Sequence, residues 1–343
     1  MAYISFQPQD YFNTVLHTGA NKTVSVGFEP SFSWVKERDA AGHALFDAVR
    51  GATKLLESND TASENTQSTS LTAFTSDGFT LGADSGGYVG GSSQATVSWN
   101  WKANGQGSSN TDGSINTTYT SASTTSGVSI IQYTGNSTSG ATIGHGLGAV
   151  PKVFMCKKTN SSGDSWRVYT AMTGNQSQLA LDQTSAADSG NTSMWNSTTP
   201  TSSLITLGNH TGVNGNTDTF ICYAFAEKTG FSKFGSYTGN GNADGTFIYT
   251  GFKPAFVIIK RTDTTNNWLI FDNKREGFNP QNDDLQANSS NAENASNRID
   301  ILSNGFKIRV TDIVVNASGG TYIFMAFSES SIVSSNGVPA VAR

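Results

Sequence analysis

The sequence has few charged residues. Only 14% of its 343 residues are Asp, Glu, Lys or Arg, against about 25% in an average globular protein. With 21 basic and 26 acidic residues the formal net charge is -5, and no cluster of Lys and Arg could follow a phosphate backbone. Nucleic acid is therefore not an expected ligand. Ser, Thr, Asn and Gly replace the charges, so solubility rests on neutral polar groups.

Long apolar runs are also absent from the sequence. The apolar runs at residues 220–226 and 322–327 are far shorter than the ~18 residues that a membrane-spanning helix needs. The first twelve residues lack the basic start and the apolar stretch of a secretory signal. We therefore expect no membrane insertion and synthesis in the cytoplasm.

Cysteine is scarce, with Cys156 and Cys222 as the two examples. In the absence of a secretory signal we expect no disulfide between them. A nucleophilic cysteine needs a neighbouring His or cation to lower its pKa, and the sequence shows no such pairing. Both cysteines align with apolar residues in other copies of the repeat described next, so we expect buried, reduced thiols that act as small hydrophobic side chains.

Internal repetition is the main feature that the sequence does contain. Tyr-Thr-Gly-Asn at 133–136 recurs at 237–240, and His17-Thr18-Gly19 is its weaker counterpart. A loop from Gly to Pro follows each copy and leads into an apolar strand. These strands occupy residues 32–36, 153–157 and 256–260. Each copy runs for roughly 100 residues, which is the size of a domain rather than of a solenoid unit.

The repeats predict an all-β fold. Short segments rich in Val, Ile, Phe, Tyr and Thr alternate with clusters of Gly, Asn, Ser and Pro, as strands and turns do. We predict three tandem antiparallel β-sandwich repeats that resemble jelly rolls. The predicted boundaries are residues 1–105, 115–228 and 229–330 for the repeats, 106–114 for a polar linker and 331–343 for a C-terminal tail. The wider stretch 106–126 is nearly all small and polar, which is typical of an extended linker.

Comparison between the copies also tests candidate catalytic residues. Acidic residues recur in the first and third copies but not in the middle one. The compared positions are Asp47, Thr170 and Asp272, and Glu64, Ser189 and Glu293. A glycosidase needs two carboxylates that converge on one bond, and nothing in the sequence indicates such a pair. We therefore predict no catalytic residue and no enzymatic activity.

No metal or cofactor site is predicted either. The four histidines lack the spacing of metal ligands. Gly-His-Gly-Leu-Gly at 144–148 resembles a phosphate-binding loop but leads into a strand, where a nucleotide site needs a helix. Residues 240–245 resemble the start of a calcium loop, yet the twelfth position is Gly251, where a bidentate Glu belongs. We expect a β-hairpin turn at 240–245 instead.

The tryptophans divide into repeated and unrepeated positions. Trp166 and Trp268 repeat and are predicted to lie in the core. Trp195, with Met194 beside it, belongs to an insertion at 191–196 that is otherwise polar. An exposed aromatic side chain on a loop can stack on a sugar ring or a partner protein. Trp195 and Met194 are therefore the candidate contact residues; the alternative is a Trp that packs its loop onto its own domain.

Taken together, the repeated motifs resemble the repeated β-sandwich structural and tail-fibre-like proteins of marine tailed bacteriophages, including cyanophages. The motifs that carry the resemblance lie at 99–105, 133–136, 144–148, 256–261, 268–272 and 322–327. The resemblance implies a virion structural protein, foremost a tail fibre or tail appendage for host attachment. Capsid-surface decoration or a head–tail structural role is the first alternative, and a glycan-binding module or depolymerase is the second.

The resemblance also implies partners and a location. The expected place is the virion surface, on the tail or the capsid exterior, after synthesis in the host cytoplasm. Other virion proteins are the expected partners, together with a host surface glycan or receptor. Because the sequence shows no coiled-coil shaft or anchoring helix of its own, we expect a homo-oligomer, either a trimer or a ring.

Overall fold

The computed structural model describes residues 6–330 except residue 92, together with 332–333 and 339–340. In this part of the chain the named strands all pair antiparallel, and the helices are three single turns. These are η1 (Pro8–Asp10), α1 (Thr211–Asn214) and α2 (Ile313–Asn316). The predicted all-β sandwich class is confirmed.

We divide the strands into three segments in chain order. The first segment contains β1 (Phe12–Thr18), β2 (Lys22–Ser25), β3 (Phe32–Glu37), β4 (His43–Asp47), β5 (Gly51–Glu57), β6 (Asn65–Thr66), β7 (Leu71–Thr75), β8 (Gly78–Leu81) and β9 (Ala95–Trp101). The second contains β10 (Tyr119–Ser123), β11 (Val128–Thr134), β12 (Ala141–Gly144), β13 (Val153–Lys158), β14 (Arg167–Thr170), β15 (Ser177–Ala180), β16 (Asp188–Ser189), β17 (Leu204–Leu207) and β18 (Thr219–Phe225). The third contains β19 (Ser232–Thr238), β20 (Phe247–Tyr249), β21 (Phe256–Arg261), β22 (Trp268–Asp272), β23 (Gln281–Gln286), β24 (Asn294–Leu302), β25 (Gly305–Ile308) and β26 (Thr321–Phe327).

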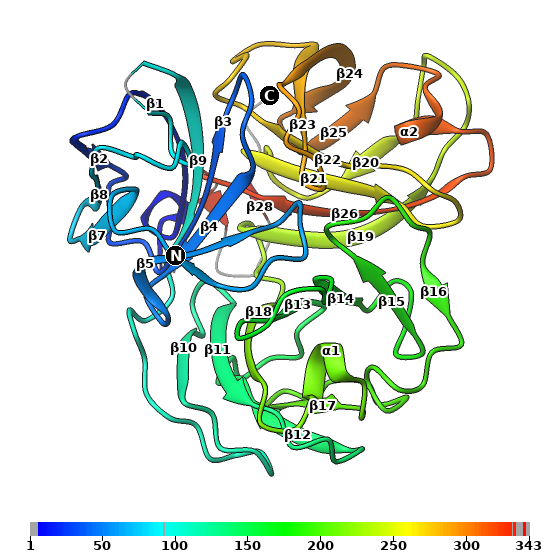
Figure 1. Cartoon of the computed structure of the whole chain (residues 1–343). Coiled ribbons are helices and arrows are strands. Elements are labelled where there is room, and N and C mark those ends of the chain that lie inside the picture. Colours follow the sequence, from blue (N-terminus) through cyan, green and yellow to red (C-terminus); the bar gives the residue numbers. More distant parts are fainter. Residues whose placement is uncertain (1–5, 92, 331, 334–338, 341–343) are drawn as a thin grey trace.

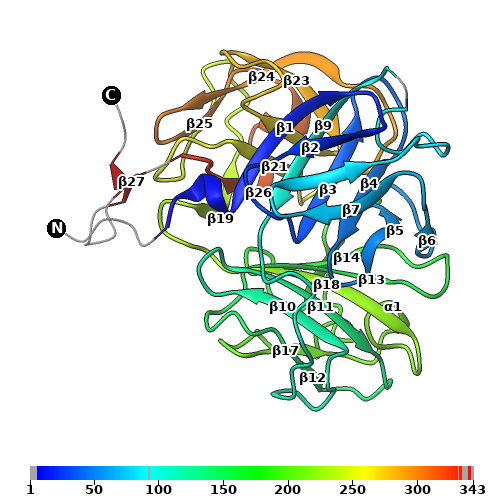
Figure 2. The same ribbon diagram turned by 90° about the vertical axis from the view of Figure 1, so that its left-hand side faces the viewer.

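Each segment has one large sheet, and five strands of that sheet follow a matching order. The orders are β1-β9-β3-β4-β5, β11-β18-β13-β14-β15 and β19-β26-β21-β22-β23. A smaller outer layer covers each large sheet: β2, β8 and β7 in the first segment, and β12 and β17 in the second. In the third segment β24, β25 and β20 continue the large sheet beyond β23 and share a core with β21 and β22. Figure 1 shows the three segments placed around a common centre, and Figure 2 shows β12 and β17 on the outer side of the second segment.

The large sheets are apolar on both faces. In β3, β13 and β21 nearly every residue is buried, although successive side chains of a strand point to opposite faces. The outward-facing residues, such as Phe154 and Cys156, form a separate core in each segment with the small outer layer or, in the third segment, with the continuation of the large sheet. The inward-facing residues of all three sheets, such as Phe32 and Met155, meet in one shared core. The segments therefore form a closed ring rather than a string of separate sandwiches.

Aromatic side chains fill the centre of the ring. Trp101, Phe225 and Phe327 occupy matching register positions in β9, β18 and β26. The Phe327 ring lies 5.6 Å from the Trp101 ring and 5.9 Å from the Phe225 ring, between centroids. Across the boundary between the first two segments, Phe32 stacks on Tyr223 at 4.4 Å. Large aromatic surfaces of this kind dominate the energy of a core, so each segment contributes to the stability of the other two.

Matching backbone hydrogen bonds close the ring at all three boundaries between segments. Their donor amides and acceptor carbonyls are Glu64 to Thr159 at 2.9 Å, Ala187 to Thr262 at 2.9 Å and Glu293 to Arg38 at 2.8 Å. The third of these joins the last segment to the first. The counterpart of Glu64 and Glu293 in the second segment is therefore Ala187. The sequence comparison, which assigned Ser189 to this position, is wrong. The repeated tryptophans also lie at boundaries: buried Trp166 donates to Glu57 O at 2.7 Å, and Trp268 to Ala180 O at 2.9 Å.

The acidic residues that repeat in two copies belong to these boundaries. Asp47 forms a buried ion pair with Arg50 at 2.6 Å and accepts the Tyr223 hydroxyl at 2.7 Å from the second segment. Asp272 forms the same pair with Arg275 at 2.6 Å and accepts Trp99 Nε1 at 3.1 Å from the first segment. At the remaining boundary the matching positions hold Thr170, Thr173 and Met325. At this boundary the carboxylate, the arginine and the hydrogen-bond donor from the neighbouring segment are all replaced. This explains why the middle copy lacks the acidic residue.

The repeated Tyr-Thr-Gly-Asn motif joins each large sheet to a helical turn. The Tyr133 and Tyr237 hydroxyls donate to backbone carbonyls of α1 and α2, at 2.6 and 2.8 Å. Buried Asn214 in α1 accepts the Asn136 amide at 2.9 Å, and its counterpart in α2 does the same. The backbone passes so close that a Cβ on Gly135 would lie 2.4 Å from a carbonyl oxygen. Glycine is therefore required at this position of the motif.

The stretch 106–126 is not an extended linker. Tyr119–Ser123 forms β10, which pairs with β11, and the preceding residues are hydrogen-bonded to the second segment. Ser108 exchanges backbone hydrogen bonds with Thr120, and the Ile115 amide donates to Thr142. Ile115 is buried in the core of that segment. Small polar residues serve here as strand and turn residues, so composition alone gave the wrong prediction.

The predicted C-terminal tail at 331–343 lies mostly outside the described residues. Within it, β27 (Ile332–Val333) pairs with β28 (Pro339–Ala340).

The two cysteines are free and buried, as predicted. They lie directly opposite each other on β13 and β18, in the core of the second segment. Their Sγ atoms are 3.0 Å apart, and burial raises the pKa of the Cys222 thiol well above its usual value. A protonated thiol is a weak nucleophile, so both side chains act as core residues.

Thiol titration tests this assignment of Cys156 and Cys222. Because both thiols are buried, we expect no reaction with a thiol reagent in the folded protein and two reactive thiols after denaturation. A loss of titratable thiol that a reductant restores would show a disulfide and contradict the assignment.

The ion pairs at the boundaries predict an unequal response to substitution. Asp47→Thr leaves Arg50 buried without its main partner, which costs about 3–5 kcal/mol of unfolding free energy. Combining it with Arg50→Thr and Tyr223→Met copies the boundary that holds Thr170, Thr173 and Met325. We expect this triple variant to be more stable than Asp47→Thr alone in urea unfolding. Equal or lower stability of the triple variant would mean that the two kinds of boundary are not equivalent.

Candidate functional site: two grooves between the segments

The residues predicted to contact a partner are not at the surface. Trp195 is 0% exposed and Met194 is 1% exposed. The Trp195 ring packs edge-on against Phe154 at 4.8 Å, and its Nε1 donates to Ser177 O at 3.0 Å. A ring without exposed surface cannot stack on a sugar, so the prediction of an exposed contact is wrong. The structure supports the alternative, in which Trp195 anchors its loop to the second segment.

In residues 240–245, which resemble the start of a calcium loop, side-chain oxygen atoms accept hydrogen bonds from backbone amides of the same loop. Asn240 Oδ1 accepts the Asn242 amide, Asn242 Oδ1 accepts the Asp244 amide, both at 2.9 Å, and the Asp244 carboxylate pairs with Lys307. The loop joins β19 to β20, which lie at opposite edges of the third sheet. The predicted β-hairpin turn is therefore also wrong. Among the described residues, no three His, Cys, Asp or Glu side chains gather in a way that could hold a metal ion.

Three buried lysines have lowered pKa values. Lys36, Lys157 and Lys260 occupy matching positions on β3, β13 and β21, and burial lowers their pKa values, to about 8 for Lys36 and Lys260. Their Nζ atoms donate to loop carbonyls: Lys36 to Ala40 at 2.6 Å, Lys157 to Asp164 at 2.5 Å, and Lys260 to Asn266 at 2.6 Å and Thr184 at 2.8 Å. Each lysine has 0% exposure. They stabilise loops and boundaries and offer no accessible amine.

His43 is likewise a structural group. It takes the position that Trp166 and Trp268 hold in the other sheets, and its Nδ1 accepts Trp34 Nε1 at 2.9 Å. Burial, reinforced by the charge of Lys36, lowers the pKa of His43 well below 6.5, and the Gln286 backbone partly offsets this shift. His43 Nε2 has no hydrogen bond of normal geometry. The imidazole is therefore neutral and fully enclosed.

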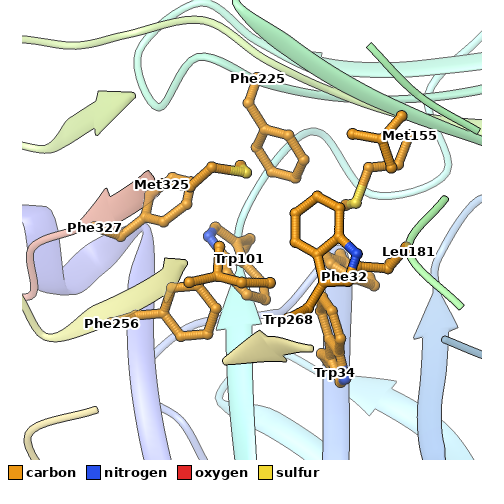
Figure 3. Close-up of a pocket in the computed structure, with 12 residues that line it drawn as sticks. Phe32, Trp34, Trp101, Met155, Leu181, Phe225, Phe256, Trp268, Met325 and Phe327 are labelled. Carbon is orange, nitrogen blue, oxygen red and sulfur yellow. The ribbon is translucent and has the colours of Figure 1, made fainter. Parts of the chain in front are cut away.

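A small cavity lies at the centre of the ring. It has a volume of about 20 Å³ and is lined by apolar side chains from all three segments, among them Phe32, Met155 and Phe256 (Figure 3). The volume is about that of one water molecule, and an apolar cavity of this size stays dry. The cavity is a packing defect rather than a ligand site.

Two larger grooves, lined by described residues, open where one segment meets the next. The Tyr249 groove, of about 370 Å³, is lined by Glu227, Thr229, Gly230, Ser232, Lys233, Tyr249, Thr250 and Gly251. The Gln9 groove, of about 350 Å³, is lined by Gln9, Asp10, Asn13, Val26, Gly27, Lys274, Glu329 and Ser330. Both volumes fall within the range of about 300–1,000 Å³ that is typical of ligand sites. They are the candidate functional sites.

The grooves are built at matching places. Glu227 and Glu329 each lie two residues beyond the end of the strand that reaches the centre of the ring, β18 or β26. Ala103 holds this position after β9. The carboxylate is therefore present at two of the three junctions.

The residues that line the Tyr249 groove include one carboxylate, Glu227, and one ammonium group, Lys233. Glu227 Oε2 lies 2.8 Å from Lys152 Nζ, while its Oε1 lies 3.4 Å from Lys233 Nζ and accepts the Phe234 amide at 2.8 Å. The carboxylate is thus held in one orientation, and of its two lysine partners Lys233 is a lining residue whereas Lys152 is not. A site of this kind offers hydrogen bonds without a strong preference for an ion of either sign.

The Gln9 groove contains two carboxylates. Glu329 Oε1 lies 3.0 Å from Lys274 Nζ and accepts Asn273 Nδ2 at 2.9 Å, whereas its buried Oε2 has no hydrogen-bond partner. Asp10, at the end of η1, supplies the second carboxylate. This groove has no aromatic side chain among its lining residues.

Aromatic side chains distinguish the Tyr249 groove. Tyr249 and Phe247 project from the same face of β20, with exposures of 60% and 44%, while Ile248 between them is buried. β20 lies at the edge of its sheet and pairs with β25 alone. The Phe247 ring lies against Gly305 on β25, where an added Cβ would approach Phe247 Cε2 to 3.1 Å. Gly305 therefore lets the ring lie close to the sheet with the rest of its surface exposed.

Sequence reasoning missed these two aromatic residues, although the repeat contains the signal. The strand registers align Phe247 and Tyr249 with Thr23 and Ser25 in β2, and with Thr142 and Gly144 in β12. The fold therefore forms with small residues at both positions. A comparison of the three copies at these outer strands identifies the aromatic pair as a feature of the third segment alone.

A family model described as "Domain of unknown function (DUF7483)" matches residues 7–331. The chain belongs to this family. The match spans all three segments and both grooves, so the unit that DUF7483 describes is the whole ring. No curated protein and no solved structure matches the chain. No helix in the described part of this DUF7483 protein is long and apolar enough to cross a membrane.

The buried lysines predict a pH dependence. Lys260 has a folded pKa of about 8 against 10.5 for its ordinary value, so between these limits the unfolded chain binds the proton more strongly than the folded chain. The unfolding free energy of the wild type should therefore rise with pH across that window, relative to Lys260→Met. Denaturant unfolding at pH 7 and pH 10 measures the difference, with exposed Lys253→Met as the control. The assignment of a lowered pKa to Lys260 would be refuted if the unfolding free energy of the wild type, relative to that of Lys260→Met, were the same at both pH values or lower at pH 10.

Proposed function

We propose that this protein is a structural component of a tailed-bacteriophage virion and acts as a tail appendage in host attachment. The supporting structural observation is the closed ring. Its strongly buried ionisable groups bind carbonyls, carboxylates and indoles of the ring itself, as Arg50, Arg275 and Lys260 do. These groups are therefore used in holding the ring together, and the candidate sites for a partner are the Tyr249 and Gln9 grooves. The sequence resemblance to tail-fibre-like proteins points to the same role.

The arrangement suits a binding body better than an enzyme. Catalytic acids and bases act from an accessible pocket in which their pKa values are tuned. The strongly shifted groups His43, Lys36 and Lys260 are enclosed, and Glu57, whose pKa burial raises to about 7, lines neither groove. The Tyr249 groove has one carboxylate, Glu227, and it is paired with two lysines. Our proposal therefore assigns the protein a binding role without enzymatic activity, with other virion proteins and a host surface glycan or receptor as its partners.

One observation favours a depolymerase as the second candidate. The Gln9 groove brings Asp10 and Glu329 into one site, and glycoside hydrolysis uses two carboxylates. Glu329 is held in place by Lys274 and Asn273. Release of reducing ends from host polysaccharide, abolished by Asp10→Asn, would establish this candidate.

Location on the particle tests the proposed function. Antibodies against the purified protein should label the tail of the virion in electron micrographs, on its exposed surface. The purified protein, added to host cells first, should reduce adsorption of the phage because it occupies the same receptors. Matched amounts of a protein without affinity for the cells provide the control.

Label on the capsid exterior, with adsorption unchanged, would reject the role in attachment and support capsid decoration. Absence of label on the particle would reject the virion assignment itself. The native mass of the assembly, measured on the same material, tests the expected homo-oligomer, which is either a trimer or a ring of several chains.

A further inference from the structure

We propose that the Tyr249 groove and the adjacent Phe247 ring form a binding site for a neutral oligosaccharide. The site deepens the proposed role in host attachment, on which it rests, by naming the chemical class of the ligand. It is carried by the two exposed rings on β20 and by the one carboxylate and one ammonium group that line the groove.

The two rings form a stacking surface. Tyr249 and Phe247 are two residues apart on one strand face, which places their Cα atoms about 7 Å apart. The C–H face of a sugar ring is apolar and packs on an aromatic face, while its hydroxyls stay at the edge and remain available for hydrogen bonds. Two rings along a strand suit a ligand of at least two sugar units.

The polar lining complements sugar hydroxyls. A hydroxyl is both donor and acceptor, so it can donate to Glu227 and accept from Lys233, whose side chains are 20% and 41% exposed at the groove. Exposed Thr229 adds a hydroxyl of its own. Among the lining residues, the Glu227 carboxylate disfavours a phosphate or sulfate and the Lys233 ammonium group disfavours a cation. These groups together favour a ligand without net charge.

The site is organised before any ligand arrives. The Phe234 amide and Lys152 fix the carboxylate of Glu227, and the close approach to Gly305 positions the ring of Phe247. Groups that are already ordered lose little conformational entropy on binding, which raises affinity for a given set of contacts. The site therefore needs no rearrangement to accept a sugar.

The scaffold does not require these aromatic residues. The first segment has Thr23 and Ser25 at the same register on β2. Two exposed rings beside a polar groove therefore need an explanation beyond folding. An exposed edge strand can also pair with a second copy of the chain, and the experiment distinguishes this outcome.

The test uses the full chain and four proteins: wild type, Tyr249→Ser, Phe247→Thr and Phe278→Ser. The first two substitutions introduce the residues that the first segment carries at the same positions, so the fold should persist; thermal unfolding checks this. Phe278 is 66% exposed and lies outside the lining of the groove, which makes it the matched control. The probe is an array of neutral oligosaccharides built from hexoses and N-acetylhexosamines, printed beside anionic ones, with affinity then measured by calorimetry.

We expect wild type and Phe278→Ser to bind the same neutral oligosaccharide, and Tyr249→Ser and Phe247→Thr to bind it about tenfold more weakly or worse. The proposal is overturned by absence of binding to the neutral panel, by preference for the anionic panel, or by affinity that both groove substitutions leave unchanged. Light scattering adds a further refuting outcome, a wild-type dimer that Tyr249→Ser converts to monomer. None of these results depends on where the protein sits on the particle.

Discussion

The structure depends on one constraint: each large sheet is apolar on both faces and must be covered on both. The outer strands of each segment cover one face, through residues such as Phe154. The other face can be covered only by the two remaining sheets, and the shared core supplies that cover. Burial of apolar surface is worth roughly 25 cal/mol per Å², so separation of the segments would expose three apolar faces at once. The ring is therefore the stable unit, and the span of the family match, 7–331, agrees with it.

Repetition leaves the three segments free to differ where the fold does not need them to match. The boundaries use two designs, one with a buried acid and cation such as Asp47 and Arg50, the other with neutral residues such as Thr170. The surface differs more: two junctions carry a groove with a carboxylate, and one of these also carries the exposed rings of Tyr249 and Phe247. Differences among copies on a common scaffold are where a binding function can reside.

Much of the fold was predictable from the sequence, because register and turn motifs repeat. The all-β class, the buried cysteines and the core position of Trp166 followed from that comparison. The shared core did not, since a strand that is buried on both faces has the same pattern whatever covers it. Two predictions based on polar sequence composition were wrong. Trp195 lies among polar residues yet is fully buried, and the polar stretch 106–126 contains a strand. The grooves join residues distant in sequence, and the one signal for the Tyr249 groove is that Phe247 and Tyr249 replace small residues of the other two copies.

Hydrogen exchange of the native full-length protein tests the central claim, that the three segments form one cooperative unit, most directly. Peptides from the strands next to the core, β9, β18 and β26, should exchange with the same free energy of opening. Met155→Ala creates a void in the shared core and costs about 2–5 kcal/mol; it should lower the opening free energy of all three strands by the same amount. If only β18 responds, or if one segment opens independently of the others in the wild type, the account of a shared core as the folding unit is contradicted.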